Sequence, residues 1–262
     1  MDQPDASSGA PSAFRFGAII IGDEILSGKR QDKHMAKAIE TLKARGLDLA
    51  WCQYLGDDPE LITTTFQRTF AGEDVVFSFG GIGATPDDHT RECVARAAGV
   101  QLVLHPEAGA EIRARFNNDP AAITPQRLAM GEFPAGSAII PNPVNRIPGF
   151  SFRRHHFLPG FPEMAWPMLV WVLDTQYTQC FAPGRVAESS IIVRGAGESQ
   201  LIALMNECLG AHCRVKVFSL PCMDPGDRHI ELGVRGDAVG VMAAIEMLKR
   251  GVTALGFSWS ER

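Results

Sequence analysis

Residues 75–90 have the sequence VVFSFGGIGATPDDHT. The first five residues are almost all apolar, which is typical of a parallel strand covered on both faces. Gly80, Gly81 and Gly83 follow at once, and without Cβ atoms they allow the backbone to turn sharply and to present N–H groups to a phosphate. The stretch therefore predicts a buried strand that runs into a phosphate-binding loop.

The residues after the glycines predict the start of a helix. Thr85 supplies an N-cap, Pro86 suits the first helical position, and Asp88 stands at the capping-box position, with Asp87 beside it. A tight turn and an acid-capped helix without a ligand would explain the same residues, so this alternative stays open. The loop is neither a Walker A motif nor a GxGxxG dinucleotide motif.

Strand and helix patterns alternate from residue 16 to about residue 100. Apolar runs at 16–21 and 47–55 predict strands, and Met35, Ile39 and Leu42 recur at helical spacing between them. This order predicts right-handed βαβ units and a mostly parallel sheet between helices. Ligands bind such sheets at the carboxyl ends of the strands.

The pattern changes after about residue 179. Strand patterns occur at 185–193, 214–220, 230–234 and 252–259, and helical patterns at 198–209 and 238–248. This βαββαβ order is the ferredoxin-like plan. We therefore expect a flexible tail at 1–13, a three-layer αβα domain at 14–178 and a small α+β domain at 179–262.

Acidic side chains follow several of the predicted strands: Asp23, Glu24, Asp57, Asp58 and Glu163. Carboxylates beside a phosphate would repel it unless a divalent cation lay between them, and magnesium is the usual choice. For any single acid, a solvated turn or a helix cap remains an alternative. Asp58, directly before Pro59, is expected to cap a helix.

Composition excludes several classes of protein. The chain has 262 residues, 45% of them hydrophobic, and a net charge of -5, which gives no electrostatic footprint for nucleic acid. Six scattered cysteines without a CxxC pair argue against a thiolate zinc site or a disulfide framework. With no signal peptide and no membrane-spanning apolar run, we expect a cytoplasmic protein.

Four motifs occur in the order found in the CinA N-terminal domain, which this chain resembles from about residue 14. They are residues 22–28 (GDEILSG), 55–58 (LGDD), 80–90 and 158–164 (LPGFPEM), and residues 194–201 resemble the start of the family's smaller following domain. The CinA domain belongs to the molybdopterin-binding superfamily. It is also similar to a domain of eukaryotic FAD synthase.

The resemblance implies roles for particular residues. Asp57 and Asp88 would lie beside the phosphate and a divalent metal, Mg or Co, as ligands and catalytic groups. The remaining expected ligand-binding residues are Gly22, Glu24, Ser27, Gly80, Gly81, Gly83, Thr85, Asp87, Pro159 and Gly160. The ligand would be molybdopterin-like or a nucleotide, and the resemblance extends to metal-dependent hydrolysis of ADP-ribose or FAD.

A non-catalytic binding or assembly module is the alternative, and relatives imply a homo-oligomer in either case. Ala84 replaces the proline usual in the family loop, and residues 31–34 replace an Asn-rich stretch. Because the chain ends at Arg262, we expect no nicotinamide-nucleotide deamidase domain.

The histidines are weaker candidates for site residues than the acids and glycines. His155 and His156 follow two arginines and are expected on a solvated edge, where at most one could face a site. Lys29 and His34 could serve a phosphate, although a surface position is the more common role for such residues.

Overall fold

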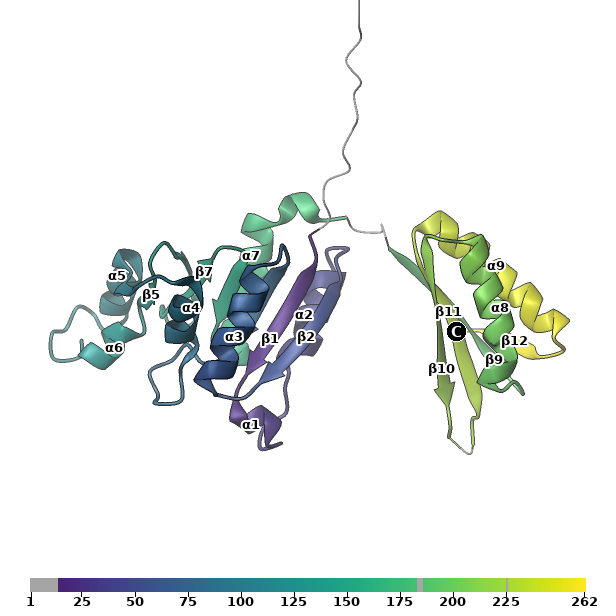
Figure 1. Cartoon of the computed structure of the whole chain (residues 1–262), viewed down its shortest axis with the longest axis horizontal. Helices are drawn as coiled ribbons and strands as arrows, with labels where there is room; N and C mark the ends of the chain where they lie inside the picture. The colour runs from purple at the N-terminus through teal and green to yellow at the C-terminus, as the bar shows by residue number, and fades with distance from the viewer. Residues whose placement is uncertain (1–13, 183–185, 225) are drawn as a thin grey trace, which may run out of the picture. The chain divides into compact units, whose positions relative to one another are not determined.

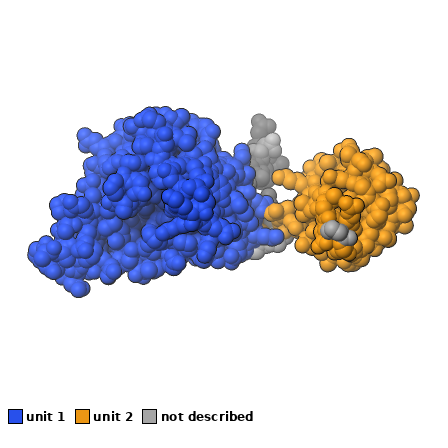
Figure 2. All heavy atoms as spheres, turned by 90° about the horizontal axis from the view of Figure 1, so that it is seen from below, with its two compact units in different colours: residues 1–181 blue, residues 182–262 orange. Residues whose placement is uncertain are grey.

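The computed structural model describes residues 14–182, 186–224 and 226–262, so the tail expected at 1–13 lies outside the described residues. The chain divides into two compact units, one ending at Phe181 and the other beginning at Ala182, coloured blue and orange in Figure 2. Each unit has its own sheet and its own hydrophobic core.

The first unit contains a six-stranded sheet in the order β2-β1-β3-β8-β7-β6, and Figure 1 labels β2, β1 and β7 of this sheet. The four strands from β2 to β8 are parallel, whereas β7 and β6 are antiparallel to their neighbours. The strands are β1 (Phe16–Ile21), β2 (Leu49–Leu55), β3 (Val75–Phe79), β6 (Ala138–Ile140), β7 (Gly149–Phe152) and β8 (His155–Leu158).

Helices cover both faces of this sheet. One core cluster joins α2 (His34–Lys43) and α7 (Pro162–Gln176) to the sheet, and the other joins α3 (Pro59–Phe70) and α4 (Thr90–Ala98) to it. Alternate side chains of one strand enter the two clusters, as with Ile20 and Ile19 of β1. The expected three-layer αβα arrangement with a mostly parallel sheet is therefore confirmed.

The segment between α4 and β6 forms an excursion for which the sequence patterns predicted no elements. It contains β4 (Leu102–Leu104), α5 (Pro106–Arg115), α6 (Pro125–Ala129) and β5 (Glu132–Pro134), and β4 pairs antiparallel with β5. Two short elements lie elsewhere in the unit, α1 (Asp23–Leu26) and the 3-10 helix η1 (Thr178–Cys180).

The two adjacent histidines of β8 correct an expectation. His155 is 2% exposed and His156 is 0% exposed, so the solvated edge predicted for them is wrong. The physical reason is that β8 lies between β3 and β7 inside the sheet, with helices over both faces. Their ring nitrogens contact hydroxyls instead, of Thr69 for His155 and of Ser151 and Tyr177 for His156.

The second unit contains an antiparallel sheet in the order β10-β11-β9-β12. Its elements are β9 (Ala187–Arg194), α8 (Glu198–Ala211), β10 (Val215–Cys222), β11 (His229–Gly236), α9 (Ala238–Ala254) and β12 (Ser258–Glu261). The predicted ferredoxin-like α+β plan is confirmed. The last strand begins later than residue 252, because Val252 is fully buried on the core face of α9 with Leu248.

None of the described helices combines the length and the apolar character that crossing a membrane requires.

Candidate functional site

Four segments meet where neighbouring parallel strands end. The N–H of Gly22, after β1, donates to the carbonyl of Leu55 at 3.0 Å, and the N–H of Gly80, after β3, donates to the carbonyl of Leu158 at 3.0 Å. Because β2, β1, β3 and β8 are consecutive in the sheet, the segments that follow them converge on its carboxyl edge. The residues predicted to form the site occupy these segments.

Glycine is required at the bend that follows β3. Gly80 has φ 103°, and a Cβ there would lie 2.2 Å from the carbonyl oxygen of Ile21. Gly81 has φ 69°, and a Cβ there would lie 2.2 Å from Oγ1 of Thr90. Thr90 closes the loop with two hydrogen bonds. Its N–H donates to the carbonyl oxygen of Gly81 at 2.9 Å, and its hydroxyl donates to the carbonyl oxygen of Gly80 at 3.1 Å.

This closure leaves successive donors free at the bend. Among the hydrogen bonds of the described residues, none uses the backbone N–H of Gly81, Ile82 or Gly83. Such consecutive N–H groups form the concave donor arrangement that suits a phosphate oxygen.

The helix expected at Thr85 begins later, so that expectation is wrong. Residues 85–88 form one turn, in which Asp88 N–H donates to the Thr85 carbonyl at 3.0 Å, and α4 starts at Thr90. The Asp88 carboxylate accepts from the Thr85 N–H at 2.8 Å and from its hydroxyl at 2.5 Å. One carboxylate oxygen of Asp88 therefore stabilises the turn, which agrees with the capping-box spacing of Thr85 and Asp88.

A hollow of about 340 Å³, here called the loop hollow, opens beside the glycine bend. Apolar side chains and prolines form much of its wall, with two asparagines among them. The lining residues are Gly80, Gly81, Ile82, Gly83, Ala84, Thr85, Asp88, Met130, Asn142, Asn145, Ile147, Pro148, Pro159, Gly160, Phe161 and Met164. Free N–H groups beside an apolar cavity suit a ligand with a phosphate and a flat organic part.

A second hollow, of about 620 Å³ and here called the acidic hollow, is lined by Asp23, Glu24, Leu26, Ser27, Lys29, Asp57 and Asp87. Asp23 and Asp57 fix each other, because the N–H of Asp23 donates to the carboxylate of Asp57 at 2.8 Å and the reverse bond measures 3.1 Å. Burial raises the pKa of Asp57, and nearby carboxylates, including Asp87, raise it further. A cation would relieve this repulsion.

The structure groups the predicted residues in two sets on either side of the turn at 85–88. Glu24, Ser27, Asp57 and Asp87 line the acidic hollow, whereas Gly80, Gly81, Gly83, Thr85, Asp88, Pro159 and Gly160 line the loop hollow. Asp57 thus shares a hollow with Asp87, and not with Asp88. Gly22 lines neither, and holds β2 through Leu55. Asp58 caps α3 as expected, accepting from the N–H groups of Glu60 and Leu61.

No preformed metal centre exists in the part of the chain that the structure describes, since no three His, Cys, Asp or Glu side chains there are grouped to hold an ion. Magnesium, however, is usually held by one or two carboxylates together with substrate phosphates and water. The pair Asp57 and Asp87 fits that second mode, in which the cation arrives with a phosphate.

Two residues near the glycine bend were not predicted as part of the site. Arg91, 5% exposed, donates from Nη2 to the carbonyl of Gly83 at 2.8 Å and from Nη1 to Ala129. His34, also 5% exposed, contacts the carbonyl of Gly160 through Nε2 at 3.2 Å, so the surface position expected for it is wrong. Both depend on contacts across the fold, and no local pattern around either residue indicates them.

Comparisons with known proteins agree with this architecture. Residues 17–178 match the model of the probable molybdopterin binding domain, MoCF_biosynth. A protein of Caldivirga maquilingensis is 32% identical over 201 residues, 75% of this chain and 77% of that protein. A protein of Aeropyrum pernix is 30% identical over 94% of this chain and 97% of its own length.

Relatives named after CinA match a smaller part of their own length. The CinA-like protein of Syntrophotalea carbinolica is 34% identical over 60% of this chain but only 39% of that protein. The crystal structure of CinA from Thermoplasma acidophilum, a protein of unknown function, superposes with a TM-score of 0.56 at 30% identity, covering 62% of this chain and 97% of that one. The chain therefore belongs to the family of probable molybdopterin-binding domains and is CinA-like.

Proposed function

We propose that residues 14–178 bind a small phosphate-bearing ligand, of the molybdopterin or nucleotide type, with its phosphate at the glycine bend and its organic part in the loop hollow. The observation that carries this proposal is the set of unpartnered N–H groups of Gly81, Ile82 and Gly83 at the wall of an apolar cavity. Family membership supports the molybdopterin-like class of ligand.

We further propose that the acidic hollow holds a divalent cation, magnesium or cobalt, once such a ligand is bound. Asp57 is held in place by Asp23, and Asp87 faces the same hollow, so these two carboxylates are the favoured ligands. The earlier assignment of Asp57 with Asp88 as metal-binding and catalytic residues stays a prediction. Asp88 would then act mainly by holding the turn next to the phosphate.

Hydrolysis of a nucleotide pyrophosphate is the catalytic form of this proposal, favoured by acids next to the phosphate loop. The loop N–H groups would bind the diphosphate and stabilise the charge that develops on it. A bound divalent ion supplies charge neutralisation and a more acidic water. A non-catalytic module would use the same N–H groups for binding alone.

Calorimetric titration tests the binding proposal, with molybdopterin, ADP-ribose and FAD as probes, each with and without magnesium or cobalt. We expect at least one probe to bind, and Asp57→Asn and Asp87→Asn each to remove the metal-dependent gain in affinity. Glu107→Gln, at an exposed acid on α5, is the matched control and should change nothing. If no probe binds the folded wild-type chain, the proposal fails.

Turnover of the bound probe separates the two forms. Release of the cleavage products by the wild type, abolished in Asp57→Ala and Asp88→Ala, would establish an enzyme that depends on these acids. Binding without products would leave the module as the function. Turnover that is unchanged in both variants would remove these acids from the mechanism.

A further inference from the structure

Two asparagines in the wall of the loop hollow differ in what their side chains bind. Asn142 is 6% exposed, and its amide nitrogen donates to the carbonyl of Ile147 at 3.0 Å. The amide oxygen of Asn142 accepts from the N–H of Val144 at 3.0 Å. Both ends of this side chain therefore hold the loop that joins β6 to β7, and Asn142 is a structural residue of that loop.

Asn145, the other asparagine, has one strong partner and one weak partner. Its amide oxygen accepts from the N–H of Ile147 at 2.9 Å, and because a backbone N–H only donates, this bond fixes which way the carboxamide is turned. Its amide nitrogen donates to the sulfur of Met164 at 3.0 Å, the one acceptor it has among the hydrogen bonds of the described residues. A thioether sulfur is a weak acceptor.

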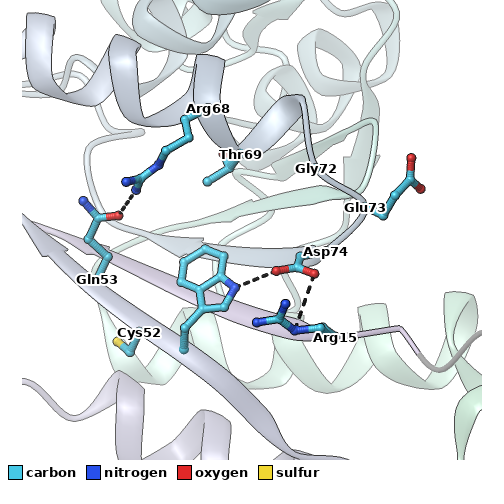
Figure 3. A pocket seen from close by; sticks show the side chains of 9 residues that line it. Arg15, Cys52, Gln53, Arg68, Thr69, Gly72, Glu73 and Asp74 are labelled. Carbon is cyan, nitrogen blue, oxygen red and sulfur yellow. Dashed lines mark hydrogen bonds and ion pairs between the residues drawn. The ribbon is translucent and has the colours of Figure 1, made fainter.

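Donors in another hollow of this unit have better acceptors. That hollow, of about 680 Å³, is bordered by residues of β2 and α3 (Figure 3). In it the indole of Trp51 donates to a carboxylate oxygen of Asp74 at 2.8 Å, and Arg68 donates to the amide oxygen of Gln53 at 2.6 Å. These donors already have oxygen partners, whereas the amide of Asn145 would gain by exchanging sulfur for oxygen or nitrogen.

The contact between Asn145 and Met164 lies at the wall of the loop hollow, because both residues line it. The glycine bend lines the same hollow, so a ligand whose phosphate binds there extends its organic part into the space that Asn145 borders. The thioethers of Met130 and Met164 suit contact with an aromatic ring. A flat ring that carries an acceptor atom therefore fits both features of this wall.

Contacts on two sides hold the loop of Asn145 in place. The N–H of Arg146 donates to the carbonyl of Asn142 at 3.0 Å. The guanidinium of Arg146 binds the carboxylate of Glu111, on α5, through two hydrogen bonds of 2.9 and 3.1 Å. A donor that is already in position loses little conformational entropy when a ligand binds. Asn145 is thus suited to distinguish a ring with an acceptor from a ring without one.

We propose that Asn145 recognises the organic part of the ligand by donating an N–H to a carbonyl oxygen or a ring nitrogen of a flat heteroaromatic ring. This inference rests on the proposed binding of a phosphate-bearing ligand at the glycine bend. The ring acceptor replaces the sulfur of Met164 as the partner of the amide. An apolar ring would displace the sulfur and leave the donor without an acceptor, so the site selects heteroaromatic rings such as those of molybdopterin, ADP-ribose and FAD.

Asn145→Asp tests this role. A carboxylate still accepts from the N–H of Ile147, so the loop keeps its conformation, but the donor is lost. Calorimetric titration with molybdopterin, ADP-ribose and FAD measures the effect. For each probe that binds the wild type, we expect the affinity of the variant to be lower by about tenfold or more, the effect of one lost hydrogen bond in a closed site.

Val144→Asp is the matched control for the added negative charge. Val144 precedes Asn145 in the same loop, is 58% exposed, and has no part in the wall of the loop hollow. The variant adds the same charge and keeps both the amide of Asn145 and the backbone N–H that bonds to Asn142. Because water and salt screen an exposed charge, its affinity for each probe should stay within about twofold of the wild type.

The side-chain amide protons of Asn145 give a second measurement, which needs no variant. Their NMR signals in the wild-type chain should move to lower field when a probe saturates the site, because a stronger acceptor replaces the sulfur. Urea unfolding verifies that each variant folds. If Asn145→Asp does not fold, the NMR titration of the wild type decides the question.

Two results would overturn this inference and leave ligand binding intact. One is equal affinity of Asn145→Asp and Val144→Asp for a probe that binds the wild type. The other is a wild-type chain saturated with that probe in which the amide signals of Asn145 have not moved. Failure of every probe to bind the wild type would instead refute the proposed function, and this inference with it.

Discussion

The buried guanidinium of Arg91 donates a hydrogen bond to the carbonyl oxygen of Gly83 at 2.8 Å. The same side chain donates to Ala129 at the end of α6, so it ties the glycine bend to the excursion that supplies Met130 to the loop hollow. Burial lowers the pKa of Arg91, but an arginine remains charged in a protein. A fixed positive charge therefore lies next to the bend, where a phosphate would gain from it.

Arg91→Lys tests this anchor. Lysine keeps the charge but lacks the planar fork that reaches two carbonyls at once, so Gly83 or Ala129 loses its donor. We expect the free energy of unfolding to fall by about 1.5–3 kcal/mol, the range for hydrogen bonds to charged groups, and affinity for the phosphate probe to fall as well. Urea unfolding and calorimetric titration measure the two effects.

Arg96→Lys is the matched control for that variant. Arg96 lies on the same helix and bonds to Glu60, to Thr63 and to the Pro59 carbonyl, away from the bend. Its loss should lower stability without a separate effect on affinity. Equal effects of both variants on affinity would mean that Arg91 acts through general stability and not through the loop.

The Gly81→Ala variant should have a lower free energy of unfolding than the Gly99→Ala variant. Both glycines have φ 69°, so both variants suffer the same left-handed strain of about 1–2 kcal/mol. Only at position 81 would the new Cβ meet another atom, Oγ1 of Thr90 at 2.2 Å, because nothing lies within 4 Å at position 99. The difference between the two variants in urea unfolding isolates the close approach. A difference near zero would contradict the bend geometry.

Stability should decline on acidification because of the two histidines inside β8. Burial lowers the pKa of His155 and of His156 to about 3, against an ordinary value of about 6.5 in the unfolded chain. Between pH values of about 3 and about 6.5, His155 and His156 are protonated in the unfolded chain but stay neutral in the native chain. The stabilisation is therefore complete above pH of about 6.5, and falls by up to about 1.4 kcal/mol per pH unit for each histidine below it.

The slope of unfolding free energy against pH measures this effect and separates it from other acid effects. Carboxylates also contribute in this window, so the comparison is with His155→Gln/His156→Gln, in which the histidine contribution is absent. We expect a shallower slope in the variant, whatever its absolute stability. An identical slope would show that the histidines are not the groups that titrate.

The sequence predicted those parts of the molecule that depend on local signals. The apolar run before Gly80 and the acid before Pro59 each fix their conformation through nearby residues, and both were predicted correctly. The ferredoxin-like unit followed from the order of its patterns alone. Residues 100–135 escaped prediction for two reasons. The strands β4 and β5 have three residues each, too few to show a period, and α5 buries only Ala108, Gly109 and Ile112, so its sequence shows no wide apolar stripe.

The site residues also divide into those that local sequence signals indicate and those that depend on contacts between distant segments. The sequence predicted a capping-box position for Asp88 but also assigned that residue to the metal with Asp57. In the structure Asp88 bonds to Thr85 of its own turn, and Asp87 lines the acidic hollow. Arg91 could not be found, since its partners are carbonyls, which every residue has. The positions of His155 and His156 depended on the strand order, which no local pattern reveals.

His34, at the start of α2, supports the loop after β8. Its ring stacks on Phe79 with centroids 4.6 Å apart, and Nε2 lies 3.2 Å from the carbonyl of Gly160, a residue of the loop hollow. Burial lowers the pKa of His34, which favours the neutral ring. Because a carbonyl only accepts, Nε2 must carry the proton and donate it.

His34→Phe should therefore weaken ligand binding with little change in stability. Phenylalanine keeps the stacking on Phe79 but leaves the Gly160 carbonyl without its donor, which frees the loop at 159–161. We expect the affinity for the phosphate probe to fall by about tenfold, equivalent to about 1.4 kcal/mol. His34→Gln, whose amide can donate to the same carbonyl, should recover part of the loss. Wild-type affinity in His34→Phe would show that this contact does not position the loop.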